Sequence, residues 1–103
     1  MGTRIRDASE LVARPGNPSP VYPQQDRLLG RQGLAVVVGR ITNDGSIISV
    51  QLERSSGSAS MDQEALKTFA KWKFMSGQQG LVRKPFQFVL SGAAKELPAR
   101  LRY

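Results

Sequence analysis

The sequence predicts an α+β domain, a two-layer sandwich in which a three-stranded antiparallel sheet carries two helices on one face. Two β-branched segments, residues 34–42 and 46–54, flank the turn signal Asn43-Asp44-Gly45, which is typical of a β-hairpin. Residues 61–72 space their apolar side chains as one face of a helix does. A shorter helix signal precedes the hairpin and an apolar strand follows the second helix, so the expected order is helix, strand, strand, helix, strand.

The chain divides into an arm, a domain and a tail. Residues 1–19 are rich in proline, glycine and asparagine near their end, so we expect a linker or extended arm, with a short helical turn near residues 8–13. The folded domain spans residues 20–91, and residues 92–103 form a C-terminal tail.

Both helices carry recognisable ends. Pro23 suits the first position of a helix over residues 24–29, because its missing N–H would be unpaired there. Gly30 suits the left-handed cap that ends this helix. Ser60 is the expected N-cap of the second helix, and Gln63 completes a capping box with it.

The three strands differ in pattern. The first alternates cleanly, with one face formed by Ala35, Val37, Gly39 and Ile41 and the other by Leu34, Val36 and Val38. The second breaks its period of two, which predicts a β-bulge near Ile48. The third, residues 82–90, contains Pro85, and this indicates an edge strand because proline cannot donate to a ladder.

The composition lacks the residues that most catalytic and metal-binding sites require. The 103 residues make one small domain, with 40% hydrophobic and 22% charged residues. There is no cysteine and no histidine, so disulfides, thiol chemistry, and the commonest general base and metal ligand are missing. The carboxylates are scattered or belong to turns and caps. We therefore expect no enzyme, no catalytic residue, no cofactor and no metal site.

The net charge of +7 fits an acidic protein partner, an anionic membrane surface or nucleic acid. Basic residues are spread along the whole chain, without a run of five or more. A nucleic-acid-binding sheet would also present aromatic side chains for stacking. The open face offers Leu34, Val36 and Val38 instead, so we expect no nucleic acid. Either the tail, through Leu97, Leu101 and Tyr103, or a partner would cover that face.

An ordered set of short signals resembles the C-terminal domain of TonB-type energy transducers. The matching elements are Tyr22-Pro23, Gly33, Asp44-Gly45, Trp72-Lys73-Phe74, and Pro85 with Phe88 and Leu90. The resemblance covers residues 18–90. The chain departs from the family pattern at Ser19, Asp26, Gly39 and Ser76.

The resemblance implies a periplasmic domain that captures the TonB box, an extended segment of an outer-membrane TonB-dependent receptor, by strand addition. It implies coupling to an ExbB/ExbD-type proton-driven complex, through an inner-membrane anchor upstream of this chain. Transport of an iron chelate, haem or another cargo would follow. The expected partner-binding residues are Ser19, Pro20, Val21, Tyr22, Arg83, Lys84, Phe86, Gln87, Phe88, Val89 and Leu90.

Two alternative functions stay open at this point: a TonB-like domain of another envelope machine or sensor and, with less support from the sequence, a small basic nucleic-acid-binding domain. A TonB-like domain of another envelope machine or of a sensor would present the same peptide-binding edge. Exposed strand edges would also allow a homodimer. Trp72 and Phe74 are expected in the core because they continue the helical spacing after Phe69.

Overall fold

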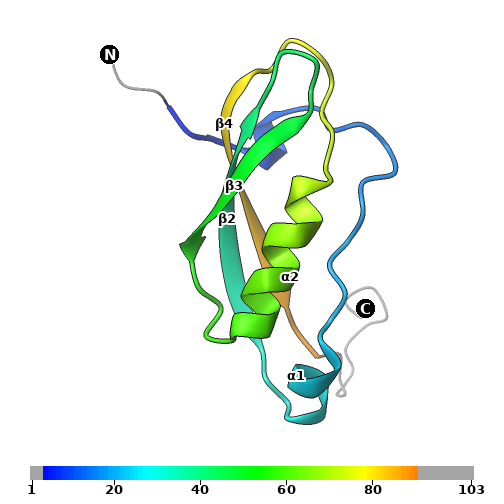
Figure 1. Cartoon of the computed structure of the whole chain (residues 1–103), viewed down its shortest axis with the longest axis vertical. Helices are drawn as coiled ribbons and strands as arrows, with labels where there is room; N and C mark the ends of the chain where they lie inside the picture. Colours follow the sequence, from blue (N-terminus) through cyan, green and yellow to red (C-terminus); the bar gives the residue numbers. More distant parts are fainter. Residues whose placement is uncertain (1–3, 91–103) are drawn as a thin grey trace.

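Residues 4–90 are described by the computed structural model of the chain. Figure 1 shows a sheet packed against one long helix, with an extended N-terminal segment running beside that helix. The elements, in chain order, are β1 (Arg6–Asp7), the 3₁₀ helix η1 (Ala8–Glu10), α1 (Gln24–Leu28), β2 (Gly33–Ile41), β3 (Ile47–Arg54), α2 (Ala59–Ala70) and β4 (Gly80–Phe88).

The α+β fold is confirmed, but the prediction of a three-stranded antiparallel sheet was wrong. Within residues 4–90 the sheet has four strands in the order β1-β4-β2-β3, and β1 runs parallel to β4. Strand β1 has only two residues, too few to show an alternating pattern. A side chain anchors it: the Arg6 guanidinium donates to the carbonyls of Gln78 (2.8 Å), Gln79 (3.0 Å) and Leu81 (3.4 Å).

The hairpin forms as predicted, including its bulge. Successive pairs Arg40↔Ser49 and Ile41↔Ile47 leave Ile48 as an extra residue in β3. Gly45 is required in the turn for two reasons. Its φ is +96°, and a side chain there would overlap the carbonyl of Phe74.

The helix ends differ from those predicted by one or two residues. Ser58, rather than Ser60, caps α2, by accepting from the Met61 N–H (3.4 Å). Pro23 is the N-cap of α1 and not its first helical residue. Helix α2 supplies the layer over the sheet, whereas α1 lies at one end of the molecule (Figure 1), which corrects the expectation that two helices share one face.

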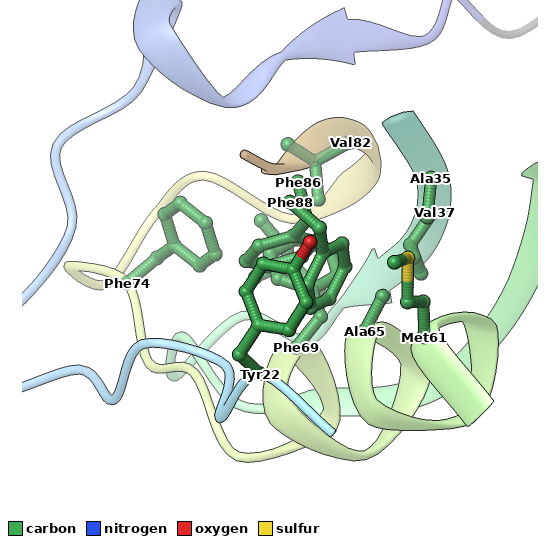
Figure 2. Close-up of a cluster of buried hydrophobic side chains, with 11 residues drawn as sticks. Tyr22, Ala35, Val37, Met61, Ala65, Phe69, Phe74, Val82, Phe86 and Phe88 are labelled. Carbon is green, nitrogen blue, oxygen red and sulfur yellow. The ribbon is translucent and has the colours of Figure 1, made fainter. Parts of the chain in front are cut away.

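The core lies between α2 and the inner face of the sheet. Aromatic side chains dominate it, and Phe69 of α2 contacts Phe74 and Phe86 edge to face. Figure 2 shows these rings with Tyr22 and Phe88. Trp72 is half-buried against the same cluster. Gly39 has no side chain where a Cβ would lie 3.1 Å from the Phe69 ring, so it leaves room for this packing.

The opposite sheet face carries the second apolar set. Val36 is 8% exposed, while Leu34 and Val38 are half-buried. Ile5 and Leu81 line a shallow hollow together with Val38. The tail residues expected to cover this face, Leu97, Leu101 and Tyr103, lie outside the described residues.

Candidate functional site

A hollow of about 310 Å³ opens between the lower half of β4, from Lys84 to Phe88, and the segment that precedes α1. On the β4 side, Lys84, Phe86 and Phe88 share one face of the strand, and Pro85 and Gln87 share the other. The other side of the hollow is the Ser-Pro-Val-Tyr segment. Its lining residues are Ser19, Pro20, Tyr22, Lys84, Pro85, Phe86, Gln87 and Phe88. This volume is at the small end for ligand sites, and one or two side chains would fill it.

Tyr22 forms the floor of the hollow and is held on several sides. Its ring is buried and meets Phe88 edge to face, with centroids 5.7 Å apart. Its hydroxyl donates to the Arg31 carbonyl, and the Arg27 guanidinium lies 5.1 Å from the ring centroid. Figure 2 shows Tyr22 in the same cluster of buried side chains as Phe88. The Tyr22 ring is therefore held in a fixed position at the floor of the hollow.

A buried carboxylate ties α1 to the start of α2 and so positions that ring. Asp26, the one buried residue of α1, accepts from the hydroxyls of Ser58 (2.7 Å) and Ser60. The Arg31 guanidinium contacts the same carboxylate at 3.4 Å. The hydrogen bond from Ser60 is the main reason that the pKa of Asp26 lies below its ordinary value, although burial acts to raise it. Sequence reasoning noted Asp26 only as a departure, and missed this cluster.

The outer edge of β4 is divided in two. Strand β1 pairs with its upper part, where Arg6 lies opposite Val82 and Asp7 opposite Arg83. The hollow lies beside the lower part, from Lys84 to Phe88. An incoming strand therefore meets β4 over about five residues unless β1 moves.

The predicted partner-binding residues separate into two groups. Seven of them line the hollow: Ser19, Pro20, Tyr22, Lys84, Phe86, Gln87 and Phe88. The other four, Val21, Arg83, Val89 and Leu90, are not among its lining residues. Val21 is 68% exposed and donates its N–H to Glu64 (2.9 Å). Arg83 pairs with Glu53 (2.7 Å), whose side chain lines the hollow on the opposite sheet face. Leu90 donates its N–H to Gln32 (2.8 Å).

Comparison with known protein families identifies the family to which the chain belongs. The family described as the Gram-negative bacterial TonB protein C-terminal domain matches residues 18–90. The chain belongs to this TonB C-terminal family. The match starts just before the Ser19–Tyr22 segment and ends just after β4, so it contains both sides of the hollow.

TonB relatives agree in sequence and in structure. The TonB protein of Xanthomonas campestris pv. campestris is 33% identical over 88 residues, which is 80% of this chain and 39% of that protein. TonB2 of Pseudomonas aeruginosa is 31% identical over 64 residues, covering 62% of this chain and 24% of that protein. The solution NMR structure of the Pseudomonas aeruginosa TonB C-terminal domain superposes with a TM-score of 0.70 at 26% identity, covering 94% of this chain and all of that one.

The chain thus spans less than half the length of these curated TonB relatives. Across residues 4–90, no helix is long and apolar enough to cross a membrane. The same residues contain no group of three or more acidic side chains that could hold a metal ion. The TonB C-terminal domain is a protein-interaction domain, not a known enzyme family.

Proposed function

We propose that this domain captures an extended segment of an outer-membrane TonB-dependent receptor, by adding it as a strand to the lower half of β4. In the full-length protein the domain would lie in the periplasm, with an inner-membrane anchor upstream. Coupling to an ExbB/ExbD-type complex would let proton motive force drive uptake through the receptor. Membership of the TonB family supports this role, and the hollow beside β4 is the main observation in favour of this location for the binding site.

The orientation of β4 supports strand addition at this edge. Successive residues of a strand direct their N–H and C=O groups to opposite sides, so Pro85 and Gln87 share one side. Strand β4 pairs with β2 in an unbroken register from Gly80 to Phe88. A proline facing β2 would remove a donor from that ladder. The register therefore favours Pro85 and Gln87 facing outward, where Gln87 offers a donor and an acceptor to an incoming backbone.

The hollow supplies the side-chain part of the interface. Tyr22, Phe86 and Phe88 give an apolar floor, and Ser19 and Gln87 are exposed polar groups at its rim. Backbone hydrogen bonds give affinity in this mode, and pockets for alternate side chains give selectivity. An interface this small fits a dissociation constant on the order of micromolar.

An amide-shift titration with peptides copied from the N-termini of TonB-dependent receptors tests the proposal. We expect saturable shifts at Gln87, Phe88 and residues 19–22. Methylating the peptide nitrogens one at a time gives a matched control that leaves the domain unchanged. Methylation should weaken binding at alternate positions only, because every second N–H of an added strand faces β4. Equal weakening at every position, or no shifts in the folded domain, would contradict strand addition.

A further inference from the structure

We propose that Lys84 selects receptor segments carrying an acidic side chain, which would pair with its ammonium group at the rim of the hollow. This inference rests on the proposed function. It deepens that function by assigning a specificity-determining residue and a chemical class of segment.

Lys84 is held at the rim by aromatic faces. Its Nζ lies 5.5 Å from the centroid of the Trp72 ring and 5.3 Å from that of Phe86. Trp72 is itself fixed, because its Nε1–H donates to the Pro18 carbonyl at 2.8 Å. The ammonium group is therefore placed over the helix side of the lower β4 edge.

This charge forms no ion pair among residues 4–90, and the carboxylates of the neighbouring strands and of α2 are engaged by other groups. Glu53 forms an ion pair with Arg83. Glu64 accepts from Val21 and pairs with Lys67 (3.4 Å). Asp7 is bound by the backbone N–H and hydroxyl of Ser9, which lower the pKa of its carboxyl, with a smaller contribution from Lys84. The ammonium group of Lys84 is thus left without an ion-pair partner among the described residues.

A bound strand would bring a complementary group within reach. Cross-strand neighbours on one face have Cβ atoms about 5 Å apart, and the flexible lysine side chain spans the rest. Lys84 and Phe88 lie on the same face of β4, so an acidic residue opposite Lys84 leaves an apolar residue of the segment facing Tyr22 and Phe88. The expected segment therefore pairs one acidic and one apolar side chain, separated by an odd number of residues.

The test compares aspartate with asparagine in otherwise identical peptides. Each position of a receptor peptide, acetylated and amidated to remove terminal charges, is replaced in turn by Asp or by Asn. Affinities are measured for the wild-type chain, for Lys84→Gln, and for the control Lys71→Gln. Lys71 is exposed and does not line the hollow, so this control makes the same charge change elsewhere.

At one position we expect the Asp peptide to bind the wild type about fivefold more tightly than the Asn peptide. The ratio should fall to about one in Lys84→Gln, persist in Lys71→Gln, and shrink with added salt. Equal binding of both peptides at every position would overturn the role of Lys84 and leave strand addition intact. Failure of every peptide to bind the folded domain would overturn the proposed function as well.

Discussion

At the scale of single residues, a buried carboxylate helps to shape the candidate site. Asp26 is fully buried in α1, whereas Leu28 of that helix and its C-cap Leu29 are 76% and 58% exposed. This inversion of the usual pattern shows that α1 is attached by hydrogen bonds rather than by apolar packing. The attachment fixes the segment that begins at Tyr22.

Replacing Asp26 with Asn tests this attachment. The carboxylate keeps a lowered pKa through its hydrogen bonds, chiefly from Ser60. Because the folded-state pKa lies below the unfolded one, its stabilisation is present above the unfolded pKa and is lost as pH falls through the folded pKa. We expect Asp26→Asn to be less stable than the wild type at neutral pH, with the difference shrinking on acidification. Urea unfolding at a series of pH values measures this, and a difference independent of pH would contradict it.

The residues that sequence reasoning assigned correctly are those whose role is local or periodic. Phe69 and Phe86 repeat at helix and strand spacing and are buried, and Gly45 follows from turn chemistry. The hydrogen bond between Ser58 and Asp26 was not predicted because these two residues lie 32 apart in sequence. Ser60 looked like the better cap, but its hydroxyl is used by Asp26 instead.

At the scale of elements, the described edges of the sheet are its least regular parts. Strand β3 carries irregularities in its pairing with β2 on either side of residues 37–40, and bulges discourage pairing between copies. A homodimer through this edge stays a prediction. At the other edge, β1 depends on Arg6 more than on its own two residues, since three carbonyls accept from that one guanidinium.

Removing this guanidinium should release β1. In Arg6→Ala we expect faster amide exchange in Arg6–Asp7 and at Val82 and Arg83, with a global loss of about 1 kcal/mol. Exchange in β2 should rise no more than this global loss requires, because β2 lies on the other side of β4 from β1. The control Arg4→Ala removes only an exposed pair with Glu10. Similar exchange patterns in the two variants would show that backbone pairing alone holds β1.

The elements themselves were largely predictable, and their association less so. Strands and helices lie within about two residues of the expected bounds because hydrophobic periodicity and Gly, Pro and Asp signals mark them. Strand β1 was missed because its place is set by a tertiary contact of the Arg6 side chain, which no local pattern encodes. The family resemblance pointed to the lower half of β4 as the binding edge. The hollow beside that edge could be recognised only in the structure.

At the scale of the whole molecule, we expect the folding stability to depend on pH only in the acidic range. Hydrogen bonds or ion pairs lower the pKa of six described carboxyls: Asp7, Glu10, Asp26, Asp44, Glu53 and Asp62. The chain has no histidine or cysteine, so no side chain with an ordinary pKa titrates between about pH 5 and 9.

We therefore expect thermal stability that changes little from about pH 5 to 9 and falls below about pH 4. Protonation there removes carboxylate charge from a chain that already carries +7, which adds self-repulsion. Calorimetry across this range measures the effect. A broad transition near pH 6 to 7 would contradict it, since it would require a strongly shifted group.

The fastening of the N-terminal segment also has a mechanical consequence. Beyond β1, Arg14 donates to the carbonyls of Lys73 and Phe74. Further along, the Asn17 amide donates to the Lys73 carbonyl, and the Pro18 carbonyl accepts from Trp72. A pull applied ahead of Arg6 would break these fasteners one after another, before any tension reached the buried ring of Tyr22. Each release would free a further stretch of chain, and the whole segment would measure at most on the order of 50 Å when fully extended. Under such a pull the arm would lengthen in steps, as a tether in series with the domain, while the edge of β4 proposed to bind peptide stayed folded.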